Sequence, residues 1–117
     1  MTSLPRRVPK PWGHEEIWAE STHYLGKILT IDTGHRLSLQ HHTDKDETVR
    51  VLSGEMDLTL EDASGVLVTR RMTAGDVAHI APGRKHRMTA VTQVQVLEVS
   101  SPHLHDVVRH EDDYGRV

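Results

Sequence analysis

Residues 47–71, ETVRVLSGEMDLTLEDASGVLVTRR, decide the fold class. Apolar and polar residues alternate over Glu47–Leu52, Glu55–Glu61 and Val66–Arg71, which is the pattern of half-buried β-strands. Turn-forming residues separate these runs, first at Ser53-Gly54 and then over positions 62–65. The stretch therefore predicts three consecutive strands joined by tight turns.

The same alternation extends over most of the chain. Further strands are expected at Tyr24–Asp32, His35–His42, Val77–Ala81, His86–Ala90 and Val94–Val99, with weaker alternation over His14–Ala19. No stretch of helical length shows the spacing of an amphipathic helix. A set of about nine short strands with regular turn signals indicates an all-β barrel or jelly roll.

The composition limits the class of protein further. A chain of 117 residues supports a single domain, 1–117. There is no Phe, so the core is expected to consist of Val, Leu and Ile, and there is no Cys, which excludes disulfides and thiolate chemistry. A net charge of −3 argues against nucleic acid as a partner. Because no membrane-spanning run or secretory signal is found, we expect a cytoplasmic protein that does not bind membranes.

The two ends of the chain depart from the strand pattern. Residues 1–11 hold three of the five prolines and are expected to form an extended arm, because proline removes a backbone donor and disfavours helix. Residues 102–117 are polar, and their composition alone predicts a loose tail.

Four side chains are candidates for a metal site, since histidine is the commonest metal ligand. Gln40 and His42 share one face of their strand, because side chains two residues apart point the same way. Glu47 follows after a short loop and can fold back beside them, and His86 begins a later strand. Two imidazoles, a carboxylate and an amide oxygen suit Zn, Mn, Fe, Co or Ni.

Other interpretations of the ten histidines compete with this site. His41 has the opposite strand parity to His42 and cannot bind the same ion. His103 and His105, followed by Asp106, have same-face spacing, but no predicted strand orients them. A solvated cluster without metal is the third interpretation, and spacing alone does not decide among them.

The spacing of these residues resembles the two motifs of the cupin family. The first motif is matched by Gly34, Gln40, His42, Glu47 and Gly54, with Gln40 in the place of the first histidine. The second is matched by Gly75-Asp76, Pro82-Gly83 and His86, with one extra residue before the proline and Ala90 in place of the closing Asn. The resemblance implies a cupin-type (RmlC-like) jelly-roll β-barrel.

A closer resemblance covers residues 10–116. Three segments are similar to the cupin domain of mannose-6-phosphate isomerases, above all the C-terminal domain of the bifunctional isomerase/guanylyltransferase type: Lys10–Gly13, Leu37–Gln40 and Val107–Arg116. This resemblance implies that residues 102–117 pack against the barrel. It also implies that Gln40, His42, Glu47 and His86 hold one divalent ion per chain, zinc first, for the aldose–ketose isomerisation of a sugar phosphate.

Such a reaction also needs a cationic anchor and a proton carrier. Strand parity over His35–His42 predicts that Arg36 and Ser38 point into the cavity and that His35 does not. Arg36 and Arg109 are the candidate catalytic residues that bind the substrate, because guanidinium groups pair with phosphate. No residue is identified as the base.

Two other classes of function stay open. One is a different metal-dependent cupin reaction of the dioxygenase, lyase or epimerase type, and the other is a non-catalytic module that binds a sugar or another small molecule. A homodimer is expected in each case, because cupins commonly dimerise and unpaired strand edges need cover. The arm could pair with a neighbour, and the leucines expected on outward faces are Leu37, Leu39, Leu58 and Leu60.

Overall fold

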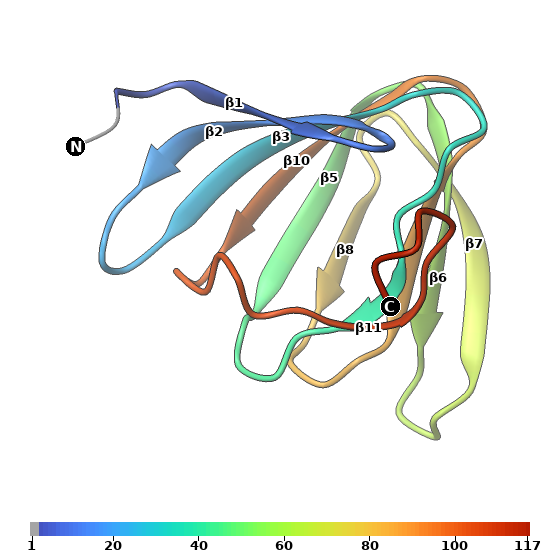
Figure 1. Cartoon of the computed structure of the whole chain (residues 1–117). Helices are drawn as coiled ribbons and strands as arrows, with labels where there is room; N and C mark the ends of the chain where they lie inside the picture. Colours follow the sequence, from blue (N-terminus) through green and yellow to red (C-terminus); the bar gives the residue numbers. More distant parts are fainter. Residues whose placement is uncertain (1–2) are drawn as a thin grey trace.

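The computed structural model describes residues 3–117 and arranges them in two antiparallel sheets that face each other (Figure 1). One sheet has six strands in the order β1-β2-β3-β10-β5-β8, and the other has five in the order β11-β4-β9-β6-β7. The strands are β1 (Arg6–Lys10), β2 (Gly13–Glu20), β3 (Leu25–Ile31), β4 (Leu39–His41), β5 (Glu47–Ser53), β6 (Glu55–Glu61), β7 (Leu67–Thr73), β8 (Val77–Ile80), β9 (His86–Ala90), β10 (Val94–Ser100) and β11 (Val108–Glu111). The expected all-β jelly-roll architecture is confirmed. Over residues 3–117 there is no helix long and apolar enough to cross a membrane.

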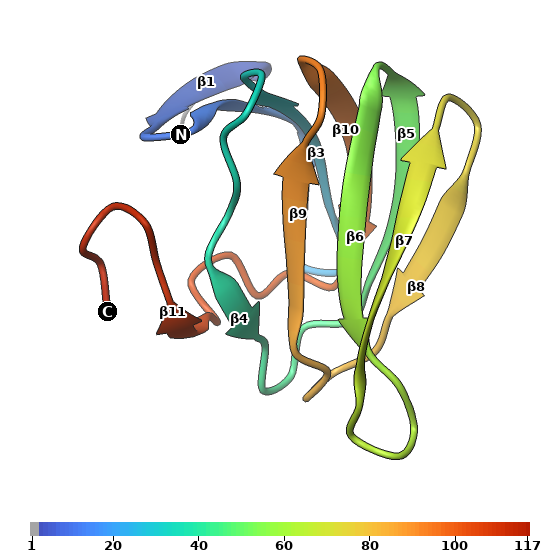
Figure 2. The same cartoon turned by 90° about the vertical axis from the view of Figure 1, so that its right-hand side faces the viewer.

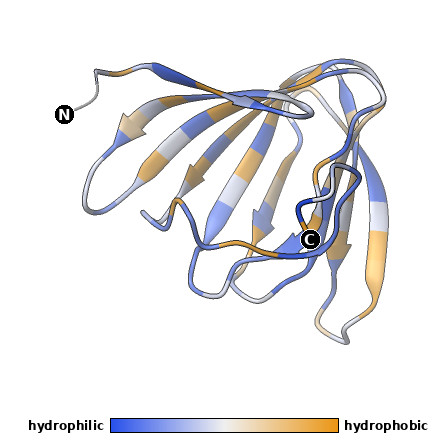
Figure 3. Cartoon of the chain, in the orientation of Figure 1, coloured by the Kyte–Doolittle hydropathy of each residue, from blue (hydrophilic) through white to orange (hydrophobic). Residues whose placement is uncertain are grey.

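Every predicted strand but one is present with closely similar ends. The turn predicted at Ser53-Gly54 joins β5 to β6. Gly54 has φ +81°, and a Cβ there would lie 2.1 Å from the Gln93 carbonyl oxygen, so only glycine fits at this position. In Figure 3, hydrophobic and hydrophilic residues alternate along several of the strands.

The predicted strand His35–His42 is the exception. Only Leu39–His41 is a strand, and the preceding segment meets β9 through an isolated bridge between Arg36 and Thr89. Regular alternation is lost there: Leu37 packs against the core, whereas the Arg36 side chain is 43% exposed. The prediction that Arg36 points into the cavity was therefore wrong.

Both chain ends take part in the sheets. β1 pairs with β2 of its own chain, and Pro9 is tolerated because β1 is an edge strand. The extended arm was thus expected, but not its place in the sheet; residues 1–2 of that arm lie outside the described part. β11 pairs with β4, so the C-terminal segment lies beside the five-stranded sheet (Figure 2).

An apolar core fills one end of the space between the sheets. It consists mainly of Val, Leu, Ile and Met, with Trp12 at its border. Leu58 is 1% exposed, and Leu37 and Leu60 pack against this core. The assignment of these three leucines to an outward face was wrong, because Leu58 shares the inward parity of Met56, which is also fully buried.

The inward faces of four strands share the same order of residue types, and this order positions the ionisable groups inside the barrel. Each has an ionisable residue at one end and apolar residues after it, all of them buried: Lys27-Leu29-Ile31, Glu47-Val49-Val51, His86-Met88-Ala90 and Glu98-Val96-Val94. Because β3, β10 and β5 are antiparallel neighbours, Lys27, Glu98 and Glu47 gather at the same end of the barrel, and His86 of the facing sheet lies at that end too.

Candidate metal centre and its cavity

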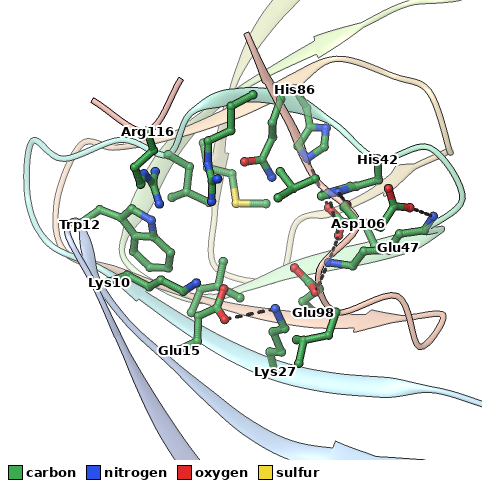
Figure 4. A pocket seen from close by; sticks show the side chains of 18 residues that line it. Lys10, Trp12, Glu15, Lys27, His42, Glu47, His86, Glu98, Asp106 and Arg116 are labelled. Atoms are coloured by element: carbon green, nitrogen blue, oxygen red, sulfur yellow. Dashed lines mark hydrogen bonds and ion pairs between the residues drawn. The ribbon is translucent and has the colours of Figure 1, made fainter. Parts of the chain in front are cut away.

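A cavity of about 80 Å³ opens at the charged end of the barrel (Figure 4). Both sheets and the C-terminal segment contribute to its wall. The polar lining residues are Lys10, Glu15, Lys27, Gln40, His42, Lys45, Glu47, His86, Glu98, Asp106, Arg109 and Arg116, and the apolar ones are Trp12, Leu29, Leu37, Met88, Leu104 and Val107.

Three buried side chains in this cavity could hold a metal ion. His42 follows β4, Glu47 begins β5 and His86 begins β9, and one ligand atom of each lies within 4.8 Å of the others. His42 Nε2 is 3.7 Å from Glu47 Oε2, and His86 Nε2 is 3.5 Å from Glu47 Oε1. Among residues 3–117 this is the one cluster of three or more such groups. His41 does not line the cavity and stacks on His110 instead.

The backbone fixes the orientation of both imidazoles. His42 Nδ1 lies 2.5 Å from the Asp106 carbonyl oxygen, and His86 Nδ1 lies 3.0 Å from that of Arg84. A carbonyl oxygen can only accept, so Nδ1 carries the hydrogen and Nε2 keeps a free lone pair. Burial lowers the pKa of both imidazoles, which favours the neutral form that binds cations.

The carboxylate of Glu47 completes a set that fits a divalent ion. Glu47 Oε2 lies 3.0 Å from the Lys45 ammonium, but neither it nor His42 Nε2 has a hydrogen-bond partner although both are buried. Burial, with the nearby charge of Glu98, raises the pKa of Glu47. A cation among these atoms would satisfy both and stabilise the buried carboxylate.

Gln40, the fourth predicted ligand, also lies at the cavity. It stands directly opposite His86 in the β4–β9 register, so the two side chains share the inward face. Its Oε1 accepts a hydrogen bond from Ser38 Oγ at 2.6 Å.

The two predicted arginines have different surroundings. Arg109 on β11 is directly opposite Gln40, which extends the inward row to Arg109, Gln40 and His86, and its buried Nε has no hydrogen-bond partner. Arg36 lies outside the cavity and makes two hydrogen bonds to Asp113, at 2.7 and 2.9 Å.

Three buried ionisable groups of the cavity were missed from sequence: Glu15, Lys27 and Glu98. Lys27 pairs with Glu15 at 3.2 Å, and Lys45 pairs with Glu98 at 2.9 Å. Burial alone would raise the pKa of Glu98 and lower that of Lys45, but their mutual attraction, helped by neighbouring charges, keeps the first low and the second high. A signal was available for Lys27 and Glu98, since each continues the inward parity of an apolar strand.

The competing pair His103 and His105 is not assembled with Asp106. His103 is exposed and makes a local hydrogen bond to Ser101, and the Asp106 carboxylate is bound by backbone amides of residues 43–45. Neither histidine lines the central cavity.

A jelly roll with this His-Glu-His cluster at one end defines the class as a cupin. The cupin domain family matches residues 27–100, more than half of the chain, and the protein belongs to that family. The expected family is thereby confirmed.

Curated relatives narrow the resemblance. The chain is 31% identical over 116 residues to the xanthan biosynthesis protein XanB of Xanthomonas campestris pv. campestris (strain B100), which covers 95% of this chain and 24% of that protein. It is 28% identical over 114 residues to mannose-1-phosphate guanylyltransferase 2 of Escherichia coli O157:H7, covering 93% and 23%. The chain thus spans about a quarter of the length of the curated relatives it matches.

Solved structures confirm the fold. Oxalate decarboxylase from Bacillus subtilis, determined at pH 4.6, aligns with a TM-score of 0.80 at 15% identity, over 91% of this chain and 30% of that one.

Proposed function

We propose that the protein is a metal-dependent isomerase that interconverts the aldose and ketose forms of a sugar phosphate. The observation that carries the proposal is the cluster of His42, Glu47 and His86, in which the buried His42 Nε2 has no hydrogen-bond partner, inside a cavity that lysine and arginine side chains also line. Gln40 is the fourth ligand. A divalent ion bound there, with zinc as the first choice, supplies Lewis acidity to substrate oxygens.

The relatives support a sugar-phosphate substrate. One of them is named for its action on mannose 1-phosphate, and the sequence motifs resemble mannose-6-phosphate isomerases. Because the chain spans about a quarter of the relatives' length, the activity of the whole relatives is not transferred to it.

Three cations of the cavity are suited to the phosphate. Arg109 offers its buried, unpartnered Nε, Lys10 lines the same cavity, and Arg116 makes a bidentate ion pair with Asp112. Guanidinium and ammonium groups are the usual partners of phosphate oxygens. Arg109 replaces Arg36 as the principal anchor in this proposal.

The proton that moves between neighbouring carbons needs a carrier. Besides Glu47 and Asp106, the cavity holds the carboxylates of Glu15 and Glu98, each beside a lysine. Glu15 and Glu98 are the candidates for acid–base work in this proposal.

The test is an isomerase assay with mannose 6-phosphate and fructose 6-phosphate, run with metal-loaded and chelated protein. The proposal expects turnover that requires metal, is abolished in His86→Ala and shows a raised KM in Arg109→Ala. His41→Ala, which alters the neighbour of His42 outside the cavity, serves as the control. Tight sugar-phosphate binding without turnover would contradict the proposal in favour of a binding module, and oxygen consumption would favour a different cupin reaction.

The proposal includes a homodimer. On the outer face of the six-stranded sheet the Trp18 ring lies over Gly26, whose cross-strand neighbour is Val99, and both apolar side chains are exposed. Covering this patch with a second copy would remove it from water. Light scattering should give the mass of two chains at tens of micromolar, falling toward one chain in Trp18→Ser; a monomeric wild type would contradict the dimer.

A further inference from the structure

The loop at residues 43–46 joins two proposed ligands of the metal. It leads from His42 to Glu47, contains no strand, and its residue Lys45 reaches into the cavity. A site on a loop is precise only when other parts of the protein hold the loop in place. The relevant question is therefore what fixes residues 43–46.

The chain that follows β10 is hydrogen-bonded to every residue of this loop. The carboxylate of Asp106 accepts three backbone hydrogen bonds, from Thr43 at 3.0 Å, Asp44 at 2.7 Å and Lys45 at 2.9 Å. At the far end, Asp46 donates its N–H to Ser101 Oγ, and Ser101 donates its N–H to the Asp46 carbonyl oxygen, both at 3.0 Å. Figure 1 shows the chain after β10 passing this loop on its way to β11.

Asp106 also reaches the proposed ligand itself. Its backbone carbonyl accepts the hydrogen of His42 Nδ1, which leaves Nε2 free and aimed at the carboxylate of Glu47 (Figure 4). One residue of the tail thus fixes the tautomer of His42 and the path of the chain between His42 and Glu47.

We propose that Asp106 is a positioning residue of the metal centre, which makes the C-terminal segment part of the site. Asp106 is not itself among the proposed metal ligands; it acts through the loop and through His42. This inference rests on the proposed function, because it assumes that His42 and Glu47 bind a metal ion.

The test measures Zn²⁺ affinity of the full chain by calorimetry with a competing chelator. Partners that orient metal ligands typically change affinity by about 10- to 100-fold when removed. We expect that loss for Asp106→Ala and a smaller loss for Asp106→Asn, which retains one acceptor oxygen. The matched control is Asp62→Ala, since Asp62 accepts the N–H groups of Ser64 and Val66 in a hairpin outside the cavity.

A second readout separates positioning from general stability. In the metal-free protein, Asp106→Ala should speed hydrogen exchange at the amides of residues 43–45, while the amides of the core strands β5 and β10 keep their protection. Equal Zn²⁺ affinity of Asp106→Ala and wild type would overturn the inference alone. Failure of the wild type to bind Zn²⁺ would overturn the proposed function and this inference together.

Discussion

The two ends of the barrel interior are built from the same strands but from opposite kinds of side chain. At one end Val49, Val51, Val94 and Val96 form part of a dry core, and none is more than 1% exposed. At the other end the same inward faces of β5 and β10 carry Glu47 and Glu98, which are nearly as buried.

The difference shows how a small barrel supports a charged site. The apolar end supplies the favourable burial that keeps the strands in register. The charged end opposes folding through desolvation, which the structure offsets by pairing Lys27 with Glu15 and Lys45 with Glu98. Substitutions or ligands that disturb one end of the barrel interior should therefore have effects of different size from those that disturb the other.

The largest loss of stability is expected when a charge is added at the apolar end of the barrel interior. Val51→Glu adds a carboxylate on the same inward face of β5 as Glu47, four residues along the strand and directly opposite the buried Val96 of β10. We expect a loss of about 4–5 kcal/mol of unfolding free energy, or failure to fold, because an unpaired charge is buried. Urea unfolding followed by circular dichroism measures it. Arg50→Glu, on the exposed face, should change stability by about 0.5 kcal/mol or less. Similar losses of stability in both variants would contradict the distinction between an apolar and a charged end of the barrel.

A smaller loss is expected when one partner of a buried pair is removed. Lys45→Met leaves Glu98 and Glu47 without their ammonium partner and should cost about 3–5 kcal/mol in the metal-free protein. Adding Glu98→Gln should restore part of that loss, because the uncompensated charge is gone. A double-mutant cycle in urea gives the coupling between them, and strictly additive losses would show that the pair is not coupled.

Metal binding should stabilise the charged end without being needed for folding. At a free Zn²⁺ concentration about 100 times Kd, linkage predicts about 2.7 kcal/mol of added stability. The chelated protein should remain folded, because the dry end does not depend on the ion. Thermal unfolding with Zn²⁺ and with chelator checks this, and a protein that unfolds on chelation would show that the apolar end is insufficient.

The smallest effect is the pH dependence of the stability that the ion pair between Asp112 and Arg116 contributes. The ion pair with Arg116 lowers the pKa of Asp112 from its ordinary 3.8 to about 2. A depressed carboxyl pKa contributes stability that is present above the ordinary value and is lost as pH falls toward the folded value. The stability difference between wild type and Asp112→Asn should therefore shrink between about pH 4 and pH 2. Urea unfolding midpoints of both proteins across that pH range measure this difference. A stability difference that does not change with pH would show that the ion pair does not cause it.

Much of the distinction between the apolar and the charged end could be predicted from sequence, because the alternation of apolar and polar residues indicates which side chains share one face of a strand. Leu29 and Ile31 indicate the inward face of β3, and the cupin spacing placed His42, Glu47 and His86 at one end of the barrel. Alternation failed where pairing is irregular, at the bridge between Arg36 and Thr89, so Arg36 was assigned to the wrong side.

The remaining features depend on contacts between distant parts of the chain. Lys45 lies in a loop, and its backbone N–H is bonded to the carboxylate of Asp106, 61 residues away. The prolines of residues 1–11 predicted only an extended arm; the arm joins the sheet as an edge strand, where the missing donor of Pro9 has no consequence. Neither relation is visible in local composition.

The most direct test of the account is the metal content of the purified protein, determined by elemental analysis. The account predicts one divalent ion per chain in wild type and in His41→Ala, and none in His42→Ala or His86→Ala. Glu47→Gln should bind the ion weakly, and Gln40→Ala should be affected least, because water can replace a neutral amide ligand. Metal retained by His42→Ala and lost from His41→Ala, or a wild type that binds no divalent ion, would contradict it.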